Sequence, residues 1–172
     1  MALTLLRHGP VHPRYQRRYN GWTDLPLERT LFEPHKLREL QTIPFDAVYC
    51  SDLRRCTETL DALGIADYTT DARLREVRFK AHIEGKNFND VSKQKDFSSE
   101  LLNDERAWHA YVCAESYERF SQRIQHFLDE TTWHDKEVLV CTHGGVIHKI
   151  YTLLSLPYVQ PLSYGEYIRI ER

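Results

Sequence analysis

The sequence lacks any marked excess of charge and any long apolar run. Its 23 Lys and Arg residues against 25 Asp and Glu residues give a formal net charge of −2 over 172 residues. A balance this close to neutral gives no basis for a nucleic-acid or membrane surface. No apolar run approaches the roughly 18 residues of a membrane-spanning helix, and the N-terminus has no basic stretch followed by an apolar region and a cleavage site. We therefore expect a cytoplasmic protein with no nucleic-acid or membrane partner.

Cysteine is scarce, and its spacing excludes several kinds of site. The four cysteines are Cys50, Cys56, Cys113 and Cys141, and none forms a C-x-x-C pair. This argues against a zinc ribbon or a thioredoxin-like redox site. Cys113 and Arg119 have the C-x₅-R spacing of cysteine phosphatases, but no glycine lies between them to form a phosphate cradle, so we take the match as a coincidence. Cys50 and Cys141 lie in strand-like runs, which predicts small buried side chains.

What the sequence does contain is an alternation of short apolar runs with helical patterns. Strands are predicted over 2–6, 45–50, 137–141 and 166–170. Helices are predicted over 31–41, 52–63, 116–130 and 146–154, with short helices of unclear bounds between 76 and 108. No repeat or linker divides the chain, so we expect one domain over 1–172. The alternation predicts an α/β fold, a three-layer α/β/α sandwich around a mostly parallel sheet with an antiparallel edge strand.

Two of the predicted strands end in a histidine that is followed by glycine. His8 follows the run 2–6, and His143 follows the run 137–141. In an open α/β sheet, ligands bind beyond the carboxyl ends of the strands. If the two strands are neighbours, both imidazoles border one crevice.

Arginines accompany these histidines. Arg7 directly precedes His8, and Arg55 lies near the start of the predicted helix 52–63. A guanidinium presents a planar fork of donors that suits an oxyanion, and a helix N-terminus adds backbone N–H groups. The sequence therefore predicts a pocket for a phosphoryl group. Arg55 as an ordinary surface arginine is the alternative, and Arg54 beside it is expected to face solvent.

Five segments, in order along the chain, resemble the histidine phosphatase superfamily, also called the phosphoglycerate mutase-like family. Together they span most of the sequence. The segments are 5–9, 21–27, 51–55, 74–76 and 138–146.

The resemblance implies that His8 is a nucleophile that forms a phosphohistidine. It implies that His143 donates to the phosphoryl oxygens, and that Glu76 protonates the leaving alkoxide and then activates water. On the residues alone, Glu76 could instead be a salt-bridged carboxylate among nearby arginines, and the family's glycine soon after it is missing.

Arg7, Arg55 and Gly144 match the family's phosphate-binding positions. The resemblance implies no metal and no cofactor, because arginines and histidines supply the positive charge. One position departs from the pattern: Arg14 stands where many members carry a phosphate-contacting asparagine. Either Arg14 replaces that contact with a charged one, or its loop takes another path. A subgroup that resembles α-ribazole-phosphate phosphatases also lacks the asparagine, and the turn at 19–24 is similar to theirs.

These features favour the phosphatase branch, a metal-independent phosphomonoesterase that acts on a small phosphate ester. A phosphoglycerate mutase-type transfer would use the same His8, but family mutases carry a larger insertion after the acid/base glutamate. A third hypothesis is a phospho-ligand binding module without turnover. The sequence leaves open the natural substrate and whether the protein is a monomer or a homodimer.

Overall fold

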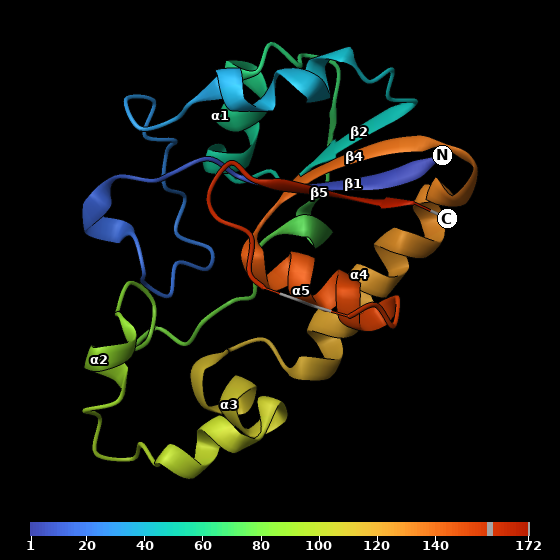
Figure 1. Cartoon of the computed structure of the whole chain (residues 1–172). Helices are drawn as coiled ribbons and strands as arrows, with labels where there is room; N and C mark the ends of the chain where they lie inside the picture. The colour runs from blue at the N-terminus through green and yellow to red at the C-terminus, as the bar shows by residue number, and fades with distance from the viewer. Residues whose placement is uncertain (158–159, 172) are drawn as a thin grey trace.

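A five-stranded sheet with the strand order β3-β2-β4-β1-β5 forms the centre of the molecule (Figure 1). The computed structural model describes residues 1–157 and 160–171. The strands are β1 (Ala2–Arg7), β2 (Ala47–Cys50), β3 (Thr69–Thr70), β4 (Glu137–Thr142) and β5 (Tyr167–Glu171). Strands β1 to β4 run parallel, and β5 pairs antiparallel with β1 at the edge. The predicted mostly parallel sheet with an antiparallel edge strand is confirmed.

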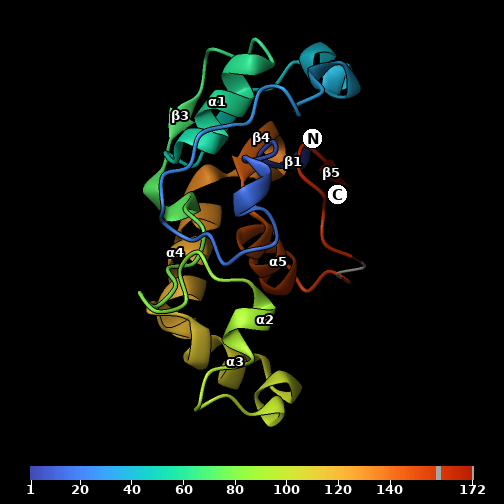
Figure 2. The same ribbon diagram turned by 90° about the vertical axis from the view of Figure 1, so that its left-hand side faces the viewer.

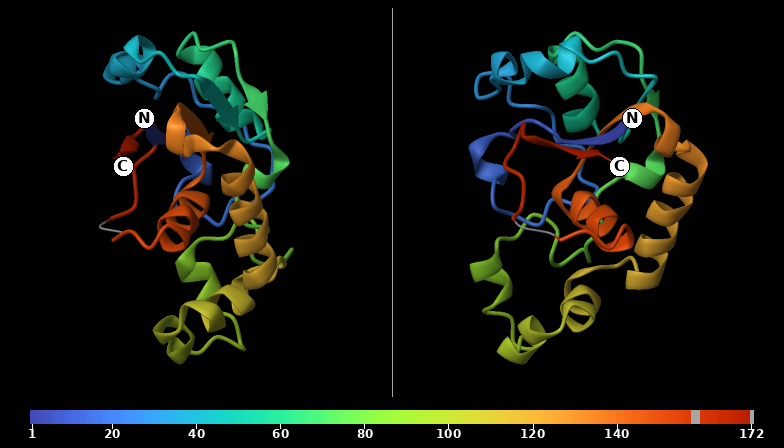
Figure 3. Two further views of the ribbon diagram at one scale, coloured as in Figure 1. Left: turned by 90° about the vertical axis from the view of Figure 1, so that its right-hand side faces the viewer. Right: turned by 45° about the vertical axis from the view of Figure 1, so that its right-hand side comes forward.

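Helices cover both faces of this sheet (Figure 2). Helix α1 (Arg54–Ala62) and the 3₁₀ segment Pro34–Thr42 lie on one face, and helices α4 (Tyr117–Thr131) and α5 (Gly144–Leu153) lie on the other. The short helices α2 (Phe88–Val91) and α3 (Glu105–Val112) lie apart from the sheet, beyond α5 (Figure 3). Further 3₁₀ turns are Pro13–Tyr15, Ala72–Leu74, Ser99–Asn103 and Trp133–Asp135. Within the described ranges, no helix is both long and apolar enough to cross a membrane.

Strands β1 and β4 are buried on both faces, and their side chains alternate between two apolar cores. Leu3 and Leu5 pack into the core shared with α4 and α5, whereas Leu6 packs into the core shared with α1. In β4, Val140 and Cys141 divide in the same way. Because a slip of one residue would exchange the faces, this alternation fixes the register of the two strands. It also explains the near-continuous apolar runs in the sequence.

The helix predicted over 31–41 begins three residues later than expected and is of the 3₁₀ type. The segment is a 3₁₀ helix from Pro34 to Thr42, interrupted at Leu37, where φ is −110° and ψ is 16°. Its buried residues are Leu37 and Leu40, a spacing of three that suits the 3.0-residue turn of a 3₁₀ helix. Pro34 also disfavours an α-helix that begins three residues earlier, because its ring clashes with the preceding turn.

Candidate active site

The pairing of the central strands brings three polar side chains to one level at the carboxyl edge of the sheet. The His8 N–H continues the β1–β4 ladder and donates to the Thr142 carbonyl at 2.9 Å. On the other side of β4, the Ser51 N–H donates to the Cys141 carbonyl at 3.0 Å. The His8 and His143 rings consequently lie next to each other, with their centroids 5.2 Å apart.

The imidazole of His8 is held as one neutral tautomer. Its Nδ1 lies 2.7 Å from the carbonyl oxygen of Gly9, and because a carbonyl only accepts, Nδ1 carries the hydrogen. Nε2 therefore keeps a lone pair. The ring is 6% exposed, and its burial, together with the positive charges of Arg55 and Arg7, lowers the pKa of His8 well below its ordinary value of 6.5. At neutral pH, Nε2 is available as a nucleophile.

His143 uses both of its ring nitrogens within the protein. Nδ1 accepts a hydrogen bond from Arg55 Nε at 3.2 Å, which leaves the ring hydrogen on Nε2, where it donates to Ser51 Oγ at 2.9 Å. Burial, with the nearby charge of Arg55, lowers the pKa of His143 well below 6.5. To donate to a phosphoryl oxygen, Nε2–H must therefore leave Ser51.

Arg55 is a buried cation without a carboxylate partner in the part of the chain that the structure describes. The side chain is 1% exposed, and it donates to the Gly21 carbonyl at 2.8 Å, to the Thr23 carbonyl at 3.0 Å and to His143. Three of its five N–H groups are engaged, which leaves two for a ligand. Arg54, next in sequence, is exposed and pairs along the helix surface. Since a buried charge is costly unless it is paired, Arg55 favours an anion at this position.

Arg7 is the second guanidinium at the strand ends. It donates to the Leu162 carbonyl at 2.5 Å, and its carbon lies 4.3 Å above the ring of Tyr164. Its Nε is buried and has no hydrogen-bond partner among the described residues. Gly144, at the start of α5, lies beside it: a Cβ there would be 3.7 Å from the guanidinium carbon. An unpaired buried donor next to a helix N-terminus is what an anion-binding pocket requires.

Glu76 points its carboxylate at the N-terminus of α5. Oε2 accepts the Gly145 N–H at 3.0 Å, and Oε1 accepts the Val77 N–H at 2.9 Å. Its backbone is also fixed, because its carbonyl accepts from Trp22 Nε1 at 2.8 Å and from Arg123 at 3.1 Å. Glu76 is thus fixed at both its backbone and its side chain.

The alternative role for Glu76, a salt-bridged carboxylate, is not what the geometry shows. Arg73 pairs with Asp71, and Arg75 pairs with Asp52. Arg78 lies over the ring of Trp22 at 5.3 Å. Among the described residues, Glu76 has no ion pair with any of these arginines.

Four of these groups border a small cavity of about 100 Å³: Arg7, His8, Arg55 and Glu76, all expected from the sequence. The other lining residues are Val11, Arg18, Tyr19, Asn20, Phe79 and Tyr164. A larger cavity of about 650 Å³ is also lined by Tyr164, but neither His8 nor Glu76 borders it. Within residues 1–157 and 160–171, no group of three His, Cys, Asp or Glu side chains could hold a metal ion.

The amino-acid pattern and the fold are both shared with known proteins. The sequence model of the histidine phosphatase superfamily (branch 1) matches residues 3–164. The chain belongs to this superfamily. It is 32% identical over 163 residues to the "Putative phosphoserine phosphatase 2" of Hydrogenobacter thermophilus, a match that covers 89% of this chain and 78% of the relative.

Solved structures of other phosphatases have the same fold as this histidine phosphatase. A mycobacterial glucosyl-3-phosphoglycerate phosphatase superposes with a TM-score of 0.79 at 20% identity, over 98% of this chain and 88% of that one. The α-ribazole phosphatase of Shigella flexneri superposes with a TM-score of 0.75 at 24% identity, over 99% and 90% of the two chains. At these identities the likeness shows the fold.

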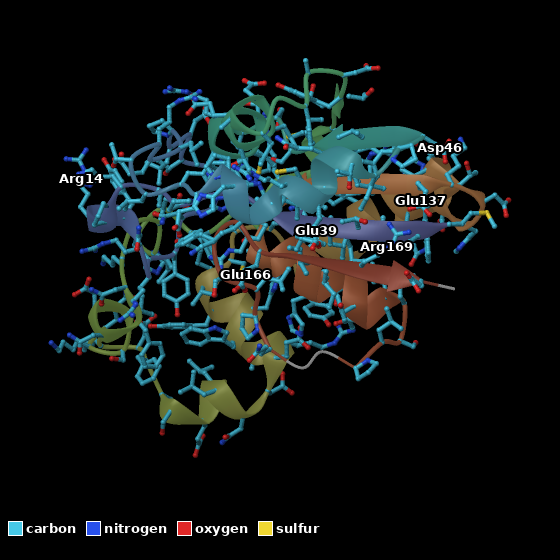
Figure 4. All side chains as sticks on the ribbon, turned by 45° about the horizontal axis from the view of Figure 1, so that its top comes forward. Arg14, Glu39, Asp46, Glu137, Glu166 and Arg169 are labelled. Atoms are coloured by element: carbon cyan, nitrogen blue, oxygen red, sulfur yellow. The ribbon has the colours of Figure 1, made fainter. Side chains whose placement is uncertain are left out.

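Three predicted site residues do not line the histidine phosphatase cavity: His143, Gly144 and Arg14. His143 lies next to His8 and Gly144 lies next to Arg7, whereas Arg14 lies elsewhere. Its side chain is exposed at the outer margin of the molecule (Figure 4). The guanidinium lies over the ring of Tyr15 at 4.5 Å and donates to the Tyr15 hydroxyl. The loop therefore takes the alternative path, and any contact of Arg14 with phosphate stays a prediction.

Six cavity residues were not among the predicted site residues: Val11, Arg18, Tyr19, Asn20, Phe79 and Tyr164. Tyr164 reaches His8 because the N–H of the next residue, Gly165, bonds to the His8 carbonyl at 3.1 Å. Gly165 has a φ of +69°, a conformation that favours glycine, and the pair Tyr-Gly was the only local signal.

The C-x₅-R match is indeed a coincidence: burial and the charge of Glu76 raise the pKa of Cys113 to about 12, so no thiolate forms there at neutral pH.

Proposed function

We propose that this histidine phosphatase hydrolyses small phosphate monoesters, without a metal ion, through a phosphohistidine on His8. The observation that carries the proposal is the state of the His8 ring. Its Nδ1–H donates to the Gly9 carbonyl, which leaves the Nε2 lone pair near the charges of Arg7 and Arg55. Among the described residues, neither guanidinium has a carboxylate partner. A neutral imidazole next to unpaired positive charge suits attack on a phosphate dianion.

In the first step, His8 Nε2 attacks phosphorus and the bond from phosphorus to the ester oxygen breaks. The leaving oxygen takes a proton from Glu76, which enters this step as the acid. Arg7 and Arg55 hold the equatorial oxygens, where they stabilise the charge of the transferring group. His143 Nε2–H turns from Ser51 toward one of these oxygens.

In the second step, a water oxygen attacks the phosphorus of phosphohistidine and the P–N bond breaks. Glu76 takes a proton from this water and regains its acid form. His8 returns to the neutral tautomer with its hydrogen on Nδ1. Inorganic phosphate leaves, and no group outside the chain is consumed except water.

The cavity supports a substrate with a small leaving group. It measures about 100 Å³, and its walls also include the rings of Tyr19 and Phe79, the amide of Asn20 and the side chains of Val11 and Arg18. Polar groups among rings suit a short polar or partly apolar alcohol. The relative from Hydrogenobacter thermophilus is named for phosphoserine, a small phosphate ester.

The test is release of inorganic phosphate from a panel of phosphorylated metabolites, with and without EDTA, by the parent and by His8→Ala. We expect turnover that EDTA leaves unchanged, and none in the folded variant. An alkaline quench should trap phosphate on His8, and mass spectrometry locates it. His35→Ala is the matched control, because that ring is 60% exposed.

Three outcomes would contradict the proposal. Phosphate release by His8→Ala at the rate of the parent would exclude the nucleophile. A requirement for a bisphosphate primer with negligible phosphate release would indicate a mutase. Tight binding of phosphate esters without any turnover would indicate a binding module.

A further inference from the structure

The Glu84 carboxylate is the centre of a hydrogen-bond cluster next to the reacting groups but not among them. Its Oε1 accepts three hydrogen bonds from one loop: from the Gly21 N–H at 2.9 Å, the Thr23 N–H at 3.2 Å and the Thr23 hydroxyl at 2.7 Å. Glu84 lies 63 residues from Gly21 in the sequence. The cluster therefore joins two distant loops.

The same two loop residues hold Arg55 with their carbonyl groups. Arg55 Nη2 donates to the Gly21 carbonyl at 2.8 Å, and Nη1 donates to the Thr23 carbonyl at 3.0 Å. Because two carbonyls accept from two nitrogens of the planar guanidinium, they fix both the position and the orientation of the Arg55 head group. The loop 21–23 thus forms a bridge between Glu84 and Arg55. Its N–H groups donate to Glu84, and its carbonyl groups accept from Arg55.

Glu84 and the loop 21–23 are in close contact. A Cβ at Gly21 would lie 2.9 Å from Glu84 Oε2 and 2.6 Å from the Val77 carbonyl, so only glycine brings the backbone this close. Glu84 itself is anchored by its neighbours. Ile83 is fully buried, and the Gly85 N–H donates to the Tyr19 carbonyl at 2.9 Å.

We propose that Glu84 is a positioning residue for phosphate binding, acting through the loop 21–23 to aim the Arg55 guanidinium at the phosphoryl group. The inference rests on the proposed function in one respect, that Arg55 binds phosphate. A shift of about 1 Å in such a group costs on the order of 10²-fold in rate. Glu84 touches neither the reacting atoms nor Arg55, and its effect passes through the backbone.

Three variants test the bridge. Glu84→Met keeps the length but loses the acceptor, Glu84→Gln keeps an acceptor oxygen, and Thr23→Val removes one donor. The readouts are kcat and KM for p-nitrophenyl phosphate, the Kd of inorganic phosphate, and a thermal melt. We expect Glu84→Met to lower kcat/KM by about 10²-fold and to weaken phosphate binding. Glu84→Gln should stay within about threefold, and Thr23→Val should lose roughly three- to tenfold, the effect of one hydrogen bond.

A double-mutant cycle with Arg55→Lys separates this role from a merely structural one. Lysine keeps the charge but lacks the fork that the two carbonyls hold. If Glu84 acts through Arg55, Glu84→Met should cost under about threefold in the Arg55→Lys background, because coupled sites are not additive. Glu118→Met, at an exposed carboxylate on α4, is the control and should match the parent.

A full 10²-fold loss in the Arg55→Lys background would overturn the inference. Equal losses in Glu84→Gln and Glu84→Met would also overturn it, as would a loss that only follows the unfolded fraction. If Glu84→Met does not fold, Thr23→Val decides: unchanged phosphate affinity there refutes the bridge. The Kd of phosphate does not depend on turnover, so a parent without phosphatase activity would refute the proposed function while this readout still judges Glu84.

Discussion

Lowering the pH should destabilise this protein more steeply than the protonation of its carboxylates alone would, because two buried histidines must stay neutral. The native pKa values of His8 and His143 both lie well below 6.5, while in the unfolded chain each returns to about 6.5. Below pH 6.5 the unfolded state therefore binds more protons than the native state. The free energy of unfolding consequently falls as the pH falls.

The size of the effect follows from linkage alone. Between pH 7.5 and pH 5.5, an unfolded histidine of pKa about 6.5 gains about 1 kcal/mol over a native one that stays neutral. His8 and His143 together should remove up to about 3 kcal/mol of stability over this range. That is a large part of the 5–15 kcal/mol, roughly, of an ordinary domain.

Urea unfolding at pH 7.5, 6.5 and 5.5, without phosphate and followed by tryptophan fluorescence, measures this loss. The decisive comparison is with His8→Gln, which removes one of the two groups and should lose about half as much stability as the parent over this range. Carboxylates titrate alike in both proteins and cancel. His35→Gln is the matched control and should follow the parent. A His8→Gln variant with the full pH dependence of the parent would refute the neutral, buried state of His8.

Two further predictions concern the acid. Glu76→Gln should slow turnover by roughly 10²- to 10⁴-fold on alkyl phosphates and by less on p-nitrophenyl phosphate, whose leaving group needs no proton; equal losses on both substrates would contradict the role. Gly145→Ala would place a Cβ 2.3 Å from Glu76 Oε1 and must displace the carboxylate. We expect the same dependence on leaving group with an unchanged Kd for phosphate, and a weaker phosphate affinity would show that the damage reaches beyond the acid.

The two histidines at the strand ends could be predicted from sequence because strands buried on both faces leave a continuous apolar run. The runs 2–6 and 137–141 match β1 and β4 to within one residue at either end. Their parallel pairing then sets His8 beside His143. Over 31–41 the helical pattern was less informative, because it fixed neither the start of the helix at Pro34 nor its 3₁₀ type.

The loop between β1 and the 3₁₀ segment Pro34–Thr42 could not be predicted, for a different reason. It has no apolar period, and its path is set by partners far along the chain, such as Glu84 for Gly21. Arg18 and Asn20 reach the cavity because the Tyr19 N–H between them pairs with the Lys86 carbonyl at 2.8 Å. Arg14, a few residues earlier, is left outside. Local sequence carries no signal for such long-range pairing.

The position of His8 in the β1–β4 ladder has a consequence for how the site opens. The His8 amide is bonded to Thr142 between the two central strands, so its hydrogen exchanges with solvent only when the sheet itself comes apart. The amides of Gly21 and Thr23 belong to a loop, which opens in smaller local fluctuations. As the denaturant concentration rises, the loop 21–23 should lose its hydrogen bonds to Arg55 well before the His8 amide leaves the β1–β4 ladder. Phosphate affinity therefore reports on the loop, and the reactivity of His8 reports on the whole fold.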